Sequence, residues 1–238
     1  MSVEEHTPSG GTAPVIAPEV VDAVEADVRR ICTRHAARLQ FHGWHHVSFV
    51  RTKAARFAVL NGAEVSVVET AALVHDVNYL VRRNSSAATG GRLRLAILKR
   101  AGVAPHVAGW IDRIVVEAEM ATRGRDISLE AQALSDADTL FKALPVTPVV
   151  LAHRYLEENG IGLRELANKI CGEQQSVHDE GFYFYNPEAA EMYTRWATAN
   201  LQLWQCIRES LDDADVSQLL EAVDRNHAAV PSTQSAVS

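Results

Sequence analysis

The sequence has few cysteines and no cysteine motif. Its 238 residues include three, Cys32, Cys171 and Cys206, which lie far apart along the chain. Such an odd, scattered set lacks the spacing of a disulfide framework or of a Cys-x-x-Cys metal site. We therefore expect reduced thiols in a cytoplasmic protein.

Long apolar runs and an excess of positive charge are also missing. No run approaches the roughly 20 apolar residues that span a membrane, and the first ten residues have neither the basic start nor the apolar stretch of a secretory signal. The 30 acidic and 23 basic residues give a net charge of -7. This balance argues against a general nucleic-acid surface, although it leaves room for a local basic pocket that binds phosphate.

Three common enzyme motifs are absent as well. The sequence contains no Walker loop, no Gly-rich dinucleotide fingerprint and no Gly-x-Ser-x-Gly elbow. P-loop, Rossmann and serine-hydrolase interpretations therefore lack support.

What the chain does contain is helical periodicity without a convincing strand. Its 47% hydrophobic and 22% charged residues are ordinary for a globular protein, and the length suits one domain with a full core. We expect an all-α bundle of roughly nine or ten helices over residues 18–226. Disordered tails rich in small and polar residues are expected at 1–17 and 227–238.

Two amphipathic runs, 44–61 and 64–76, predict a helical hairpin that turns at Gly62. His46 lies at the edge of the apolar stripe of the first run, and His75 lies on the stripe of the second, so His75 faces the first helix. Asp76 is about 100° further round the helix, so one ion can use both side chains only near the helix end. The partial negative charge at that end favours a cation.

A further ligand is expected later in the chain, because an ion wants four to six. Residues 134–140 form an apolar helical stretch that carries two acids. If Leu134 and Ala137 belong to its buried stripe, Asp138 lies beside the stripe and Asp136 points away. Asp138 is therefore the expected ligand.

These three segments resemble the main motifs of the HD-domain superfamily of metal-dependent phosphohydrolases. The resemblance rests on HGWHHV, AALVHDV and AQALSDADTL at 42–47, 71–77 and 131–140, and it extends over roughly residues 20 to 210. It implies a helical fold and hydrolase activity, with a divalent metal ion held by four ligands: His46, His75, Asp76 and Asp138.

The chain also departs from the HD pattern. Binuclear relatives add two histidines between the His-Asp doublet and the last Asp, whereas here that interval has only His106, and Glu117 stands where many relatives have a histidine. We therefore expect a single ion. The family's nucleotidases often carry an acid soon after the doublet, and here Val77, Asn78 and Tyr79 follow it, which leaves the substrate open.

The expected chemistry is attack by a metal-activated water. Two histidines and two aspartates suit Mn, Fe, Co, Ni, Zn or Mg, and the ligand set does not choose among them. Asp76 or Glu117 is the expected proton acceptor. Lys142, one turn after Asp138, can steady a phosphate, pair with Asp138 or point to solvent.

Candidate substrate-binding residues flank the metal motifs. His42 lies one turn before His46 and is expected to support a ligand or to bind substrate. Residues 82–91 form a polar loop expected over the site, and Arg82, Arg83 and Arg92 suit bidentate contact with phosphate. Each of these arginines can equally be a solvated loop residue.

The predicted function is a metal-dependent phosphohydrolase of a nucleotide or another small phosphate ester. The alternatives are an HD-type hydratase or hydrolase of a small carbon-nitrogen compound, an HD oxygenase and a non-catalytic HD binding module. The expected partner is a small anionic substrate, without membrane binding, and the oligomeric state stays open.

Overall fold

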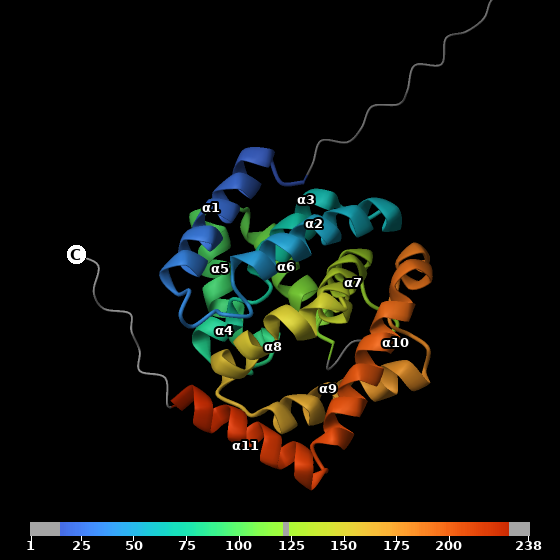
Figure 1. The fold of residues 1–238 in the computed structure, drawn as a ribbon. Coiled ribbons are helices and arrows are strands. Elements are labelled where there is room, and N and C mark those ends of the chain that lie inside the picture. Colours follow the sequence, from blue (N-terminus) through green and yellow to red (C-terminus); the bar gives the residue numbers. More distant parts are fainter. Residues whose placement is uncertain (1–14, 121–123, 229–238) are drawn as a thin grey trace, which may run out of the picture.

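The computed structural model describes residues 15–120 and 124–228, and all regular secondary structure in these two stretches is helical (Figure 1). The predicted all-α fold is therefore confirmed. In chain order the elements are α1 (Pro18–Arg34), α2 (Trp44–Asn61), α3 (Val65–Val74), α4 (Asn78–Val81), η1 (Ala87–Gly90, a 3-10 helix), α5 (Gly91–Arg100), α6 (Pro105–Glu117), α7 (Leu129–Ala143), α8 (Val146–Asn159), α9 (Leu163–Asp179), α10 (Pro187–Ser210) and α11 (Ala214–Ala228).

The hairpin of α2 and α3 forms as the sequence predicts. Gly62 adopts a left-handed conformation with φ of 70°, which glycine tolerates without the clash that a Cβ causes. Helix α7 packs against both members of the hairpin, and α1 and α6 pack against α3. The face that α2 presents to the core carries small and apolar side chains, namely Val47, Val50, Ala54, Phe57 and Ala58.

A second group of helices lies beside this core. Helix α10 packs against α9 and α7, and in Figure 1 the orange α9 and α10 and the red α11 lie on the same side of α7. Helix α8 joins the two groups, since it follows α7 and contacts it.

Some predicted boundaries differ from the structure. The predicted N-terminal tail reaches residue 17, but Ile16 is buried and its amide donates to Ser66 Oγ at 3.1 Å, so the last residues of that tail belong to the fold. The final helix extends to Ala228. Residues 1–14 and 229–238 lie outside the described residues.

Two predicted loops are partly helical. The short helix η1 lies within the expected loop 82–91. Helix α9 extends to Asp179, into residues 176–186, whose aromatic side chains and Gly181 predict a loop packed as a lid. The α9 extension has a physical reason, because Val177 lies seven residues after Ile170 and so continues the apolar stripe of the helix.

The three cysteines are unpaired, with Cys32 and Cys171 buried and Cys206 exposed. Among the helices of the described residues, none combines the length and the apolarity that crossing a bilayer requires.

Candidate metal centre

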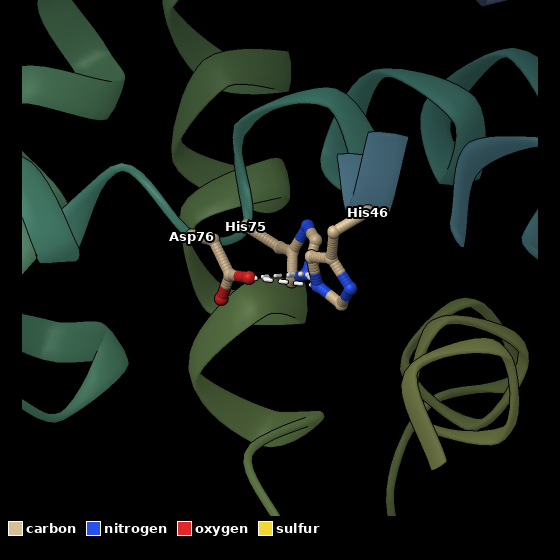
Figure 2. A group of neighbouring side chains, drawn as sticks. All are labelled: His46, His75 and Asp76. Carbon is tan, nitrogen blue, oxygen red and sulfur yellow. Dashed lines mark hydrogen bonds and ion pairs between the residues drawn. The ribbon is translucent and has the colours of Figure 1, made fainter. Parts of the chain in front are cut away.

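The structure brings together three of the predicted ligands from two helices. His46 lies in the first turn of α2, and His75 and Asp76 follow directly after α3. Figure 2 shows the two imidazole rings and the carboxylate directed toward one another. His46 Nε2 lies 2.8 Å from Asp76 Oδ2 and 3.0 Å from His75 Nε2, and His75 Nε2 lies 3.1 Å from the same Asp76 oxygen.

The fourth predicted ligand lies at the edge of this cluster. Asp138 on α7 places Oδ1 3.6 Å from His46 Nε2. Its other oxygen, Oδ2, accepts a hydrogen bond from Lys142 Nζ at 2.7 Å. Three separate segments of the chain therefore deliver the four side chains to one region, with a lysine beside them.

The hydrogen-bond pattern fits a cation at the centre of the cluster. His75 Nδ1 lies 2.8 Å from the carbonyl oxygen of Ala72, which can only accept, so this nitrogen carries a proton and Nε2 is the atom that faces the cluster. Asp76 Oδ2 is buried and has no hydrogen-bond partner of good geometry among the described residues, and the same holds for His46 Nδ1. Two ring nitrogens and a carboxylate oxygen thus meet within about 3 Å, an arrangement that one shared cation satisfies.

The electrostatics favour a neutral His46 and an ionised Asp76. Burial lowers the pKa of His46, which keeps the ring neutral. Burial alone would raise the pKa of Asp76, but the charges of His75 and His42 and the close approach of the His46 and His75 ring nitrogens hold that pKa well below its ordinary value. Burial likewise acts to lower the pKa of His75, yet Asp76 outweighs it and raises that pKa. Asp76 is therefore a carboxylate, and it stabilises a positive charge between the rings, whether a proton or a metal ion carries that charge.

Two adjoining cavities give access to the cluster. A small one of about 100 Å³ borders His75, Asp76 and Asp138. A larger one of about 560 Å³ is lined by residues of α8, α9 and α10. They share five lining residues, so the cluster opens toward the larger cavity: Tyr79, Ser85, Glu119, Met120 and Lys142.

The predicted substrate-binding residues divide between the cavity and the outer surface. His42 lines the larger cavity and stacks on Tyr79, with ring centroids 3.6 Å apart. Arg82, Arg83 and Arg92 are exposed, and none of them lines either cavity. The structure thus does not support the predicted contact of these arginines with a phosphate, although Ser85 and other residues of the same loop do line the cavity.

Glu117 is also placed differently from the prediction. It accepts hydrogen bonds from the amide and the hydroxyl of Ser128, at 3.3 and 2.7 Å, and so holds the start of α7 rather than the cluster. Glu119, two residues later, lines both cavities, and its Oε1 accepts from the amide of Ala87 at 3.2 Å. The sequence predicts that this helix presents Glu117 or Glu119 inward, and Glu119 is the one that borders the cavities, just after the helix ends at Glu117.

One buried acid near the site was not predicted. Glu158 on α8 is 1% exposed and accepts hydrogen bonds from the amides of Phe41 and His42 and from His42 Nδ1. Tyr155 lies three residues earlier on the same buried face of α8. An acid at helical spacing from a buried aromatic was the sequence signal for this contact.

Two further histidines and two tyrosines, whose side chains could bind an ion or stack on a base, lie outside the site. His45 and His153 are exposed, and neither lines a cavity. Tyr183 is buried, and its hydroxyl lies 3.0 Å from His178 Nδ1, while the hydroxyl of Tyr185 donates to the carbonyl of Gly124. Both tyrosines therefore act as packing anchors rather than as a stacking surface for substrate.

Comparisons with known proteins give a relative and a fold. No family model matches the chain. It is 29% identical over 152 residues to the uncharacterized protein YpgQ of Bacillus subtilis (strain 168). The aligned region covers 60% of this chain and 67% of YpgQ. This chain is homologous to YpgQ. The crystal structure of Bacillus subtilis YpgQ in complex with ADP resembles this fold with a TM-score of 0.54 and 20% sequence identity, covering 82% of this chain and 96% of that one.

Proposed function

We propose that this protein is a metal-dependent phosphohydrolase of the HD type that acts on a nucleotide or another small phosphate ester. The observation that carries the proposal is the meeting of His46 Nε2, His75 Nε2 and Asp76 Oδ2, which lie 2.8 to 3.1 Å from one another. His75, Asp76 and Lys142 line one small cavity beside this cluster. The complex of the homologous YpgQ with ADP supports a ligand of this size and charge. The cavity volume of about 560 Å³ lies in the range of small-molecule sites.

His46, His75 and Asp76 would hold the ion, and Asp138 would complete the set after a small approach. This set of two nitrogens and two oxygens suits Mn, Fe, Co, Ni, Zn or Mg. When bound, a divalent ion lowers the pKa of water and offsets negative charge that develops on the substrate.

The protein's own side chains supply the remaining parts of a hydrolysis. Lys142 borders both cavities and can transfer a hydrogen bond from Asp138 to a phosphate oxygen, which orients the substrate beside the cluster. A water oxygen attacks phosphorus, its proton passes to a carboxylate, and the bond from phosphorus to the leaving oxygen breaks. Three carboxylates border the cavity beside the cluster: Asp76, Asp138 and Glu119. Asp138 is paired with Lys142, which leaves Asp76, already ionised, and Glu119 as the proton acceptors.

The charges in the cavity favour phosphate over the carbon-nitrogen substrates of other HD-type enzymes. Lys142 and Lys169 both line the larger cavity, and a neutral substrate such as a nitrile would not need two ammonium groups. An oxygenase of this type would use a second ion and its additional histidines, and the one histidine in the relevant interval, His106, is exposed.

One observation favours a second candidate, a binding module without catalysis. Asp138 is already paired with Lys142, which satisfies one of its oxygens without a metal. In such a module Lys142 would stay with Asp138, and a phosphate ligand would bind without being cleaved.

Metal analysis and phosphate-release assays separate these candidates. The protein as purified is tested for bound metal and then assayed with nucleotides and an aryl phosphate ester, with Mn, Fe, Co, Ni, Zn or Mg added in turn. We expect a stoichiometric ion and phosphate release that is lost in Asp76→Ala and His46→Ala. His45→Ala is the matched control, because this exposed neighbour of His46 lies outside both cavities. Nucleotide binding without phosphate release under any metal would establish the binding module instead.

A further inference from the structure

A second lysine faces the cavity from the wall formed by α9. The residues of this helix that line the larger cavity recur at helical spacing, with Leu166, Ile170 and Val177 as the apolar members. Lys169 and Glu173 lie on the same face, one turn apart. Two charged residues thus interrupt an apolar stripe at the position where it borders the cavity.

Lys169 and Glu173 pair with each other, but this pair opens easily. Lys169 Nζ lies 2.8 Å from Glu173 Oε1, with the two side chains 39% and 48% exposed. Ion pairs with this exposure contribute little to stability. A lysine four residues before a glutamate also stabilises a helix less than the reverse order does. An incoming anion can therefore replace Glu173, whose carboxylate is free to turn toward solvent.

Lys169 and Lys142 line the same cavity, and the charge of Lys142 acts on Lys169. Burial and the charge of Lys142 act to lower the pKa of Lys169, while the hydrogen bond to Glu173 acts to raise it. The net effect is a raised pKa, so Lys169 keeps its positive charge. Tyr155 lines the same cavity, and the charges of both lysines act to lower the pKa of its hydroxyl. One lysine is thus next to the metal cluster, and the other lies further along the same cavity.

We propose that Lys169 binds a second anionic group of the substrate, that Glu173 competes with this group, and that the ligand is a diphosphate or longer chain rather than a monophosphate. This inference rests on the proposed function and assigns its substrate class. The anionic group at the cluster contacts Lys142, and the next group along the chain reaches Lys169. A ligand with a single phosphate meets only the first lysine, so it gains nothing from the second.

The test compares the binding of ADP and AMP by calorimetry. Titrations use the protein as purified and again after chelation, which stops turnover while the lysines remain. We expect the wild-type protein to bind ADP at least about tenfold more tightly than AMP, as expected for one charge-assisted hydrogen bond. Lys169→Met should reduce that ratio to about one by weakening ADP alone, and Lys169→Arg should keep most of it.

Glu173→Gln provides the opposite change. It removes the competing carboxylate, so ADP should bind about threefold more tightly while AMP is unaffected. Glu165→Gln on the same helix and Lys99→Met on α5 are matched controls, because both residues are exposed and lie outside the cavity. Both controls should keep the wild-type ratio.

The outcomes separate this inference from the proposed function. Equal weakening of AMP and ADP in Lys169→Met, or weaker ADP binding in Glu173→Gln, would overturn the second anion site. A wild-type protein that binds ADP no more tightly than AMP would overturn it as well. Absence of phosphate release alongside the expected binding ratios would refute only the hydrolase, and the second anion site would stand.

Discussion

Asp136 and Asp138 lie two residues apart on α7, and their carboxylates serve different parts of the molecule. Asp136 is fully buried and accepts from the amides of Tyr185 and Asn186, each at 2.8 Å, at the start of α10. Asp138 approaches His46 and Lys142 at the cavity. One carboxylate therefore fixes the fold, and the other borders the candidate metal centre.

We expect asparagine at position 136 to affect stability and asparagine at position 138 to affect metal binding. Asp136→Asn removes a buried charge that accepts two amide hydrogen bonds, which should lower the free energy of unfolding by about 1.5 to 3 kcal/mol. Asp138→Asn should change that free energy little, because the hydrogen bond to its carboxylate comes from the partly exposed Lys142, but it should weaken metal binding at least about tenfold. Chemical denaturation and metal titration measure the two effects, and equal stability losses would contradict this division.

The clustering of the candidate metal ligands could be predicted because it depends on helical spacing. His46, His75 and Asp138 lie on or beside apolar stripes with a period of three to four residues, and Gly62 marks the turn that brings two of them together. Asp136 shows the limit of this reasoning. It was expected to point away from the buried stripe, but α10 covers that side of α7, and no local pattern reveals a helix that packs from 50 residues away.

The cavity walls were harder to predict for the same reason. Arg82 and Arg83 follow the His-Asp doublet closely in sequence, but both side chains point to solvent. The lysine on the opposite wall, Lys169, belongs to α9 and lies about 90 residues further along the chain. Distance in sequence was the only available guide, and tertiary packing of α8, α9 and α10 decides which charges line the cavity.

Glu117 and Glu119 provide a comparison of two carboxylates at the end of one helix. Glu119→Gln keeps an oxygen for the amide of Ala87 but removes a proton acceptor from the cavity, so kcat should fall about 100-fold without loss of metal. Glu117→Gln should leave kcat nearly unchanged and lower the free energy of unfolding by about 1 kcal/mol, because the contact with Ser128 weakens. Steady-state kinetics and denaturation distinguish them, and a larger kcat loss in Glu117→Gln would restore Glu117 as the candidate base.

The contact between Glu158 and His42 predicts how stability depends on pH. Burial would raise the pKa of Glu158, but the hydrogen bond and charge of His42 and the amides of Phe41 and His42 outweigh it and lower that pKa below 4.5. A carboxyl with a lower pKa in the folded state stabilises the protein above about pH 4.5, and this contribution disappears as the pH falls through the folded pKa.

Glu158→Gln should therefore be less stable than the wild type near neutral pH by about 1 to 3 kcal/mol. The difference between the two proteins should shrink as the pH falls from about 6 to about 4 and below. Urea denaturation across this range measures it. A difference that stays constant or grows in acid would show that the folded pKa of Glu158 is not lowered.

Gly90 gives a way to disturb the metal centre without changing a ligand. A Cβ at this position would lie 2.9 Å from the amide nitrogen of Asn78, two residues after Asp76. Gly90→Ala must therefore displace the backbone that follows Asp76, and with it Tyr79 at the junction of the two cavities. We expect weaker metal binding and a free energy of unfolding lowered by about 1 to 3 kcal/mol.

Gly109→Ala is the control, because a Cβ at this position within α6 meets nothing within 4 Å. This substitution should raise the free energy of unfolding by about 0.5 to 1 kcal/mol. Unchanged metal affinity in Gly90→Ala would mean that Asp76 keeps its position independently of the segment behind it.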